Sequence, residues 1–298
     1  MVRDNLQLWS LALPAILQLF VFAYLPMFGI VLAFKKFNVS AGILGSPWNG
    51  LENFRFYFES ADAVRTLRNT LVMNGLFIII NTSLAICLGL ALFEIPNRTV
   101  VKTYQTIFVL PHLVSWVVVG YITYTLFQPS LGLVNGILTY FGLNPVQWYS
   151  EAKYWPGILV FFSAWKSVGM SCLYYYGALM GVDEEIFEAA KLDGAGRLQT
   201  ALYVSLPFLI PTITIMTILS IGGIFHADFG LFYNLTQDSG MLYSTTDVID
   251  TYIYRALMKL GNVGMSSSVG LFQSFVGMIL VFITNTIVRR IDPERALI

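Results

Sequence analysis

Long apolar segments without charge are the feature of this sequence that most limits what it can fold into. No Asp, Glu, Lys or Arg occurs in Leu8–Phe34, in Leu71–Ile80 or in Val269–Val288. A helix of about 20 mainly apolar residues crosses the hydrocarbon core of a bilayer. The sequence therefore predicts an all-α polytopic membrane protein with about six transmembrane helices. The six expected helices are Leu8–Phe34, Leu71–Phe93, Tyr104–Phe127, Trp155–Met180, Leu202–Phe225 and Val269–Val288.

Composition excludes several classes of function. Hydrophobic residues make up 56% of the chain and charged residues 11%, whereas a soluble domain carries about 25% charged residues. The formal net charge is zero, so the basic face that a nucleic-acid partner needs is not expected. Cys87 and Cys172 lie in apolar runs, and His112 and His226 are isolated. We therefore predict no metal site, no catalytic residues and no enzymatic activity.

An ion-coupled secondary transporter is the alternative membrane function. Such a protein would place ion-coupling carboxylates inside its spans. Here Glu94 lies at the end of a span, and no Asp or Glu lies near the centre of one. No internal repeat of the kind that builds many secondary transporters is visible. These observations disfavour the alternative.

The charges between the spans bear on orientation. Six spans place both termini on the same side of the membrane. Lys and Arg are equally numerous in the loops of the two sides, so the positive-inside rule alone gives a tie. The pair Arg289–Arg290 directly follows the last span, and Arg98 and Lys102 lie in a short loop. We therefore expect both termini in the cytoplasm.

The polar segment 182–200, between the fourth and fifth spans, has the signals of a short capped helix. Asp183 can cap its N-terminus, and Glu184 and Glu185 suit the first turn because they face the positive end of the helix dipole. Gly194 stands where a left-handed residue ends the helix. A second helix is expected to enter the membrane through Leu206–Pro207. The segment thus predicts a rigid helix–turn–helix.

This segment resembles a motif of a known family. The strings Glu188-Ala189-Ala190 and Asp193-Gly194, followed by Leu206-Pro207 and two final spans, closely resemble the "EAA" coupling loop of ABC importer permeases. The resemblance implies that Glu188, Ala189, Ala190, Asp193 and Gly194 contact a cytosolic ATPase. An ordinary capped helix is the alternative interpretation of the Glu-Ala-Ala string alone.

The resemblance covers most of the chain. Leu110–Val118, Trp165–Gly169 and Val248–Arg255 are similar to oligosaccharide permeases of the maltose and multiple-sugar type, and most similar to the subgroup for complex polysaccharide fragments. An ABC permease for phosphate, peptides or amino acids is the alternative within the family.

The family implies a fold and a set of partners. It implies one transmembrane permease domain over residues 1–298, with the type I (methionine-permease-like) importer fold and the coupling loop at 182–200, in the bacterial cell membrane. A second permease subunit, usually different from the first, a cytosolic ATPase dimer and an extracellular solute-binding protein complete the assembly. ATP and Mg bind the ATPase, and this chain lacks the Gly-x-x-x-x-Gly-Lys-[Ser/Thr] loop that would bind ATP. Transport would proceed by alternating access.

Candidate substrate contacts lie in the fourth span. Lys166 is about eleven residues into it, or roughly 16 Å, near the bilayer midplane. A charge at that depth is costly, and it usually faces a cavity or a partner. We expect Lys166, Ser163 and Ser167 to lie on the substrate path, where a cation would suit acidic sugars. A snorkelling lysine and helix–helix hydrogen bonds of the serines are the alternatives.

Polar residues between the last two spans are candidates for docking of the solute-binding protein. Asp228, Asn234 and Asp247 lie in this long segment, on the side opposite to the coupling loop. An ordinary solvated loop is the alternative interpretation.

Overall fold

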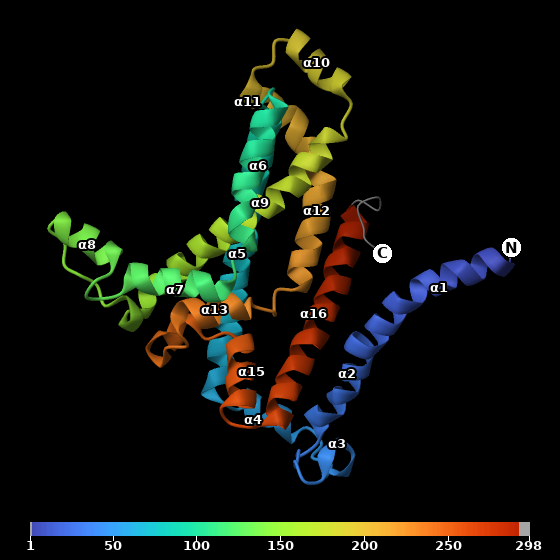
Figure 1. Ribbon diagram of the computed structural model, residues 1–298, viewed down its shortest axis with the longest axis vertical. Helices are drawn as coiled ribbons and strands as arrows, with labels where there is room; N and C mark the ends of the chain where they lie inside the picture. The colour runs from blue at the N-terminus through green and yellow to red at the C-terminus, as the bar shows by residue number, and fades with distance from the viewer. Residues whose placement is uncertain (1, 292–298) are drawn as a thin grey trace. The chain divides into compact units, whose positions relative to one another are not determined.

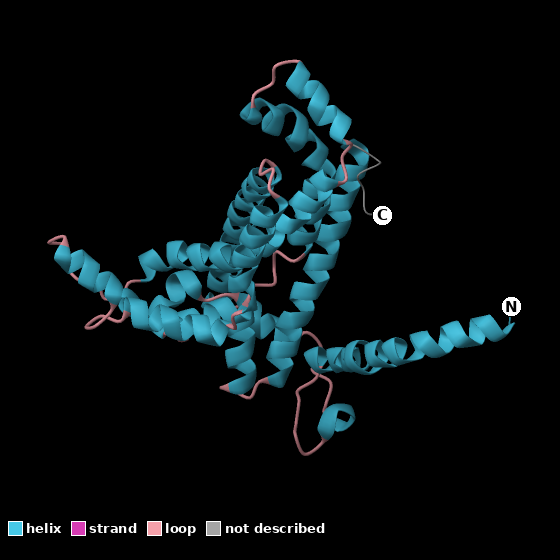
Figure 2. Ribbon diagram, turned by 45° about the horizontal axis from the view of Figure 1, so that its top comes forward, coloured by secondary structure: helices cyan, strands magenta, loops and turns pink. Residues whose placement is uncertain are grey.

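Helices make up the regular secondary structure of residues 2–291, the part of the chain that the computed structural model describes (Figure 2). An isolated bridge between Lys35 and Trp48 adds no strand. The described residues fall into two compact units. Unit 1 comprises Met1–Val64 and Tyr252–Ser274, and unit 2 comprises Arg65–Thr251 and Phe275–Ile298. The sequence was expected to form one domain over residues 1–298, of which residue 1 and residues 292–298 lie outside the description.

Five of the six expected spans are helices long and apolar enough to cross a membrane. Both ends of each helix lie within ten residues of their expected positions. The largest difference is at the second span, which begins at Ala61 instead of Leu71. The all-α polytopic prediction is therefore confirmed. The five helical segments are Trp9–Phe34, Ala61–Phe93, Ala152–Met180, Arg197–Gly222 and Val263–Arg290.

The third expected span, Tyr104–Phe127, differs from the prediction of one continuous helix. It is divided between α6 (Arg98–Leu113) and α7 (Trp116–Phe127), which meet at an angle of 88° (Figure 1). Pro111 lies in the last turn of α6, where it weakens the helix by removing a backbone donor. Val114 is then extended, and the Ser115 hydroxyl caps α7 by accepting from the Val118 amide at 3.4 Å. Proline and cap together account for the break.

Unit 2 is organised around α9 (Trp155–Met180). Near its start, α9 contributes Trp155, Leu159 and Phe162 to a buried apolar cluster with α13 (Phe229–Thr236). Nearer its end, Cys172 and Leu179 join a second buried cluster with α5 (Ala61–Phe93) and α12 (Leu206–Gly222). The other buried members of this second cluster are Ala85, Leu92, Val168, Tyr175 and Leu209. One helix thus carries both parts of the core.

Glycines let the helices of unit 2 approach closely. A Cβ at Gly169 of α9 would lie 1.8 Å from the carbonyl oxygen of Phe108 on α6. A Cβ at Gly222 of α12 would lie 2.4 Å from Val281 on α16 (Val263–Ile291). A side chain at Gly169 would collide with the backbone of α6, and one at Gly222 would have to displace the Val281 side chain, so glycine allows the close approach at both positions.

Unit 1 begins with the first span, which is helical but not uniform. It runs through α1 (Val2–Leu19), a π-turn (Phe20–Tyr24), α2 (Leu25–Met27) and a 3₁₀ segment (Phe28–Phe34). Residues 9–28 are exposed all round within the chain, as suits a helix in lipid or against another subunit. The short helices α3 (Gly42–Gly45) and α4 (Glu52–Phe58) follow.

Aromatic contacts join the two chain segments of unit 1. Tyr57 of α4 packs against Tyr252 with ring centroids 5.1 Å apart, and Phe58 packs against Phe272 at 4.9 Å. The Asn53 amide donates to the carbonyls of Ala33 and Lys35 at 2.9 and 3.0 Å.

The remaining short elements of the chain are α8 (Leu133–Tyr140), α10 (Glu184–Leu192), α11 (Arg197–Thr200), a π-turn (Ala201–Ser205), α14 (Tyr243–Thr246), α15 (Ile249–Met258), and 3₁₀ turns at Trp148–Ser150, Ala152–Tyr154 and Gly240–Leu242.

Candidate functional site

The loop between the fourth and fifth spans folds as its local signals predict. The Asp183 carboxylate accepts from the Glu185 amide at 3.3 Å and so caps α10. Gly194 has φ of +81°, the left-handed conformation expected at the end of the helix. Its amide donates to the Lys191 carbonyl at 3.1 Å, and the Ala195 amide donates to Ala190 at 3.0 Å. The predicted capped helix is confirmed.

One face of α10 is fixed to the chain and the other is open. Phe187 is buried, and its ring packs on Phe93 at the end of α5 with centroids 5.0 Å apart. Glu188, Ala189, Asp193 and Gly194 are exposed, and Ala190 is half-buried. The four exposed residues belong to the predicted contact set. A rigid helix therefore presents them to solvent.

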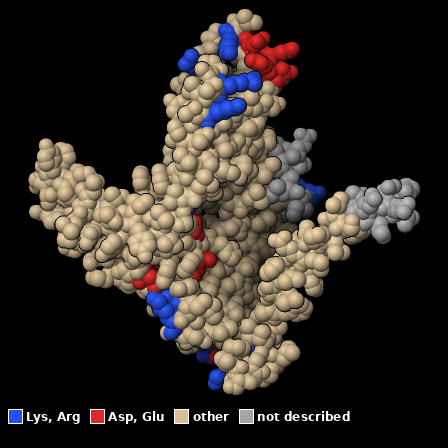
Figure 3. Space-filling view, viewed as in Figure 1, with Lys and Arg blue, Asp and Glu red and all other residues tan. Residues whose placement is uncertain are grey.

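Two apolar side chains are also exposed in this loop, one at the end of α10 and one in α11. Leu192 and Leu198 are 89% and 72% exposed. This is a large apolar exposure in a loop that is rich in charged residues. Figure 3 shows Asp and Glu atoms gathered over α10 and Lys and Arg atoms beside them. Apolar residues ringed by charge are typical of a surface that binds another protein.

Ser163 and Ser167 lie where α9 faces α5. The Asn81 amide of α5 donates to the Ser163 and Ser167 hydroxyls at 3.0 and 3.4 Å, and the Ser167 hydroxyl donates to the Ser163 carbonyl. These are the helix–helix hydrogen bonds of the alternative interpretation. Beside them is a pocket of about 230 Å³ whose polar lining comprises Asn81, Thr82, Ser167, Ser171, Tyr174, Tyr175 and Ser220.

One residue of the pocket lining has an unused acceptor atom. The Oδ1 atom of Asn81 is buried and has no hydrogen-bond partner among the described residues. A buried acceptor without a donor costs free energy. Asn81 and Ser167 both line the pocket, but the Oδ1 atom itself is buried, so it is a feature of the α5–α9 contact beside the pocket.

Lys166 points away from this pocket and toward the break between α6 and α7. Its ammonium donates to the carbonyls of His112 at 2.8 Å, Pro111 at 3.4 Å and Val114. It also lies 5.0 Å from the centroid of the Trp116 ring. The last carbonyls of a helix have no intrahelical donor, so Lys166 supplies donors from another helix. Its place on the substrate path stays a prediction.

The three docking candidates differ in how accessible they are. Asp228 is exposed; it accepts from the Trp116 indole at 2.7 Å and caps α13 through the Leu231 amide at 3.1 Å. Asn234 is half-buried and donates to the Gly230 carbonyl at 2.8 Å. Both stay candidates for contact with a docked protein.

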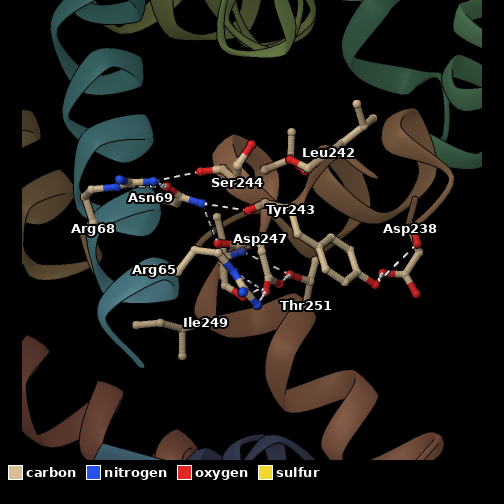
Figure 4. Close-up of polar contacts among 12 residues, drawn as sticks. Arg65, Arg68, Asn69, Asp238, Leu242, Tyr243, Ser244, Asp247, Ile249 and Thr251 are labelled. Atoms are coloured by element: carbon tan, nitrogen blue, oxygen red, sulfur yellow. Dashed lines mark hydrogen bonds and ion pairs between the residues drawn. The ribbon is translucent and has the colours of Figure 1, made fainter. Parts of the chain in front are cut away.

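The prediction that Asp247 is a docking residue must be corrected. It is 1% exposed and forms an ion pair with Arg65 at 2.6 Å (Figure 4). The Thr251 hydroxyl donates to its other oxygen at 3.1 Å. A buried carboxylate needs such partners, and a docked protein would not reach it. Asp247 therefore stabilises the inside of unit 2 instead of forming a docking surface.

Sequence reasoning missed the polar network around Asp247. The Asn69 amide donates to the carbonyls of Tyr243 and Asp247 at 3.2 and 3.0 Å, and Arg68 donates to the Ser244 carbonyl at 2.7 Å (Figure 4). These contacts join the start of α5 to α14 and the turn after it. Because the partners lie more than 170 residues apart in the chain, no local pattern indicates them.

Comparison with known proteins gives a consistent set of relatives. The family model described as "Binding-protein-dependent transport system inner membrane component" matches residues 10–296. Protein LplB of Bacillus subtilis (strain 168) is 34% identical over 287 residues, which cover 96% of this chain and 90% of LplB. The polygalacturonan/rhamnogalacturonan transport system permease protein YteP of the same organism is 33% identical, with 96% and 89% covered.

A solved structure has the same fold. It is the crystal structure of a bacterial ABC transporter involved in the import of the acidic polysaccharide alginate, and one of its chains superposes with a TM-score of 0.88. The two chains are 31% identical, and the match covers 98% of each. A second structure, with a TM-score of 0.86 and 30% identity, is of a bacterial alginate ABC transporter in complex with an alginate pentasaccharide-bound periplasmic protein.

Proposed function

Because the chain belongs to the family of binding-protein-dependent transport system inner membrane components, it is a permease subunit of an ABC importer, and we propose that its solute is an acidic oligosaccharide. It is a transport subunit and not an enzyme. Two relatives support the choice of solute: YteP is named for polygalacturonan and rhamnogalacturonan, and the structural neighbour imports alginate. An ion-coupled transporter and an ABC permease for a non-sugar solute are less well supported.

The exposed face of α10 is the observation that carries the mechanism. Glu188, Ala189, Ala190, Asp193 and Gly194 seat in a cleft of a cytosolic ATPase, which binds ATP and Mg. Phe187 keeps the helix attached to the rest of unit 2 through Phe93. Closure of the ATPase dimer would then move α10 and the spans beside it together, and the path would open alternately to the two sides.

The remaining partners follow from the same arrangement. With α10 in the cytoplasm, the six-span topology places both termini there as well. The opposite side, which includes Asp228 and Asn234, receives the extracellular solute-binding protein. A second, different permease subunit pairs with this chain, and the apolar surface exposed along residues 9–28 of the first span suits such a contact or lipid.

The substrate path runs past the pocket between α5 and α9. Its hydroxyl and amide groups match the hydroxyls of a sugar, because each can both donate to and accept from them. Ser167 lines the pocket, and Ser163 is bonded to the pocket residue Asn81. Lys166 lies in the same stretch of α9, but its ammonium is bonded to the carbonyls at the end of α6, so its place on the substrate path stays a prediction.

Transport by the reconstituted assembly tests this proposal. The chain is purified from its native membrane with its associated subunits, placed in liposomes, and supplied with the co-purified binding protein. We expect uptake of uronic-acid oligosaccharides that requires internal ATP, and slower uptake of neutral oligosaccharides of the same length. Uptake that proceeds without ATP would contradict the importer mechanism. Equal uptake of both sugars would contradict the acidic substrate alone.

A further inference from the structure

Three side chains from three elements meet at the break between α6 and α7. Lys166 of α9 donates to the carbonyls at the end of α6 and lies over the Trp116 ring at the start of α7. The indole N–H of Trp116 donates to Asp228, the cap of α13, at 2.7 Å. An ammonium near the face of an indole is itself attractive. The break is therefore held by Lys166, Trp116 and Asp228, called here the break cluster.

The helices on the two sides of the break form two closely fitted pairs. Gly169 fits α9 against α6, because a Cβ there would lie 1.8 Å from Phe108 O. Gly230 fits α13 against α7, because a Cβ there would lie 2.3 Å from Trp116 Cδ1. A Cβ at Gly120 of α7 would likewise lie 2.8 Å from Asn234 O. Tightly packed pairs move as units and do not deform continuously.

The covalent link between α6 and α7 is short and extended. Val114 and Ser115 have ψ of 131° and 149°, and no helical hydrogen bond crosses them. Such a link leaves the angle between two helices free unless side chains fix it. Lys166 joins both sides of the link, because it bonds Val114 and the end of α6 and also contacts Trp116.

The same helix that carries Lys166 leads directly to α10. α9 ends at Met180 and α10 begins at Glu184. We propose that Lys166 is a positioning residue of the transport cycle, which fixes the angle between α6 and α7 so that movement of α10 and α9 is passed to the α7–α13 pair. This rests on the proposed coupling function. The apolar cluster that α9 shares with α13 also includes Val119 of α7, so it holds the α7–α13 pair against α9 without Lys166; the bonds of Lys166 to the end of α6 are what tie the break itself to α9.

Uptake and ATP hydrolysis in proteoliposomes measure this role. Lys166→Met removes the donors and keeps much of the side-chain volume. We expect maximal uptake of both acidic and neutral oligosaccharides to fall about tenfold or more, as loss of a charge-assisted hydrogen bond allows. ATP hydrolysis continues, so the ATP used per sugar rises, while the concentration of loaded binding protein that gives half-maximal uptake is unchanged. Lys153→Met removes a lysine in an exposed ion pair and is the matched control.

Conservative variants keep the test informative if Lys166→Met fails to fold. Lys166→Arg retains donors for the carbonyls and should restore most of the coupling. Trp116→Phe removes the bond to Asp228 and should raise the ATP used per sugar by a smaller factor. Spin labels at Tyr104 of α6 and Tyr121 of α7, with Cys87 and Cys172 replaced by serine, report the α6–α7 angle directly. Their distance distribution should broaden in Lys166→Met.

Three results would overturn the proposal. The first is uptake by Lys166→Met within twofold of the unmodified protein at an unchanged ATP cost. The second is a loss confined to acidic sugars, which would make Lys166 a substrate-selectivity residue. The third is an unchanged spin-label distribution. In each case ATP-dependent uptake by the unmodified protein would still stand, so the proposed function is tested separately.

Discussion

The helix that follows α9 and the helix that Lys166 of α9 contacts have termini that are capped in different ways. α10, just after α9, is capped by its own neighbours, Asp183 at its start and Gly194 at its end. The end of α6 is capped by Lys166, which lies 52–55 residues away in the chain. A helix with local caps keeps its shape by itself and can leave one face open for a partner. A helix end capped from a distance ties two parts of the fold together.

The largest expected effect concerns the close contact between α9 and α6, on which the capping of α6 by Lys166 depends. Gly169→Val places a branched side chain where even a Cβ would lie 1.8 Å from the Phe108 carbonyl oxygen. We expect a loss of about 3 kcal/mol or more in the free energy of unfolding, seen as poor yield and a lowered Tm in detergent. Gly177→Val on the same helix, where a Cβ meets nothing within 4 Å, is the control. Equal losses in both variants would contradict the close α6–α9 contact.

The ion pair between Arg65 and Asp247 is the second remote contact. Arg65→Met removes the cation 2.6 Å from a carboxylate whose side chain is 0% exposed. We expect a destabilisation of roughly 2–3 kcal/mol, at the low end for a buried pair because Arg65 itself is 30% exposed. Thermal unfolding measures it. Adding Asp247→Asn should restore part of the stability; a further loss of the same size would show that the two residues act independently.

Changes to the local caps should affect coupling more than stability. Gly194→Val forces a β-branched residue to φ of +81°, which costs about 1–2 kcal/mol locally. We expect ATP-driven uptake to fall at least tenfold while Tm changes by only a few degrees. Gly196→Ala, at φ of −74°, should keep near-normal uptake. A large drop in Tm for Gly194→Val would mean that α10 is part of the core.

The smallest effect is expected at the start of α10. Asp183→Ala removes the side chain that accepts from the Glu185 amide and costs about 1 kcal/mol of helix stability. We expect a fall in uptake of a few-fold. Asp183→Ser can accept the same hydrogen bond and should be close to normal. Equal uptake by the two variants would indicate that the cap does not matter for coupling.

The difference between local and remote contacts also decides what could be predicted from the sequence. The spans depend on runs of apolar residues, and the caps of α10 depend on residues within one helix turn, so both were predictable. The break at Val114–Ser115 has local signals in Pro111 and Ser115, but the apolar run continues through it and indicates a single helix. The partners of Lys166 could not be predicted because they depend on that break.

The polar network around Asp247 shows most plainly what the sequence could not predict. Asp247 lies in a polar segment, which by itself indicates a solvated loop. Its partner Arg65 is 182 residues away, and only the packing of α5 brings the two together. A polar residue in such a loop can be exposed, as Asp228 is, or buried and paired, as Asp247 is. The sequence around the two residues does not distinguish these cases.

The contact made by the open face of α10 tests the account most directly. A photo-crosslinking amino acid replaces Ala189 in the assembled transporter, and in a second sample it replaces Leu131, which is 85% exposed in the loop between α7 and α8. We expect irradiation to join the chain to the ATPase from position 189 and not from position 131. A crosslink to the ATPase from position 131, or none from position 189 in an assembly that still transports, would contradict the coupling role of α10.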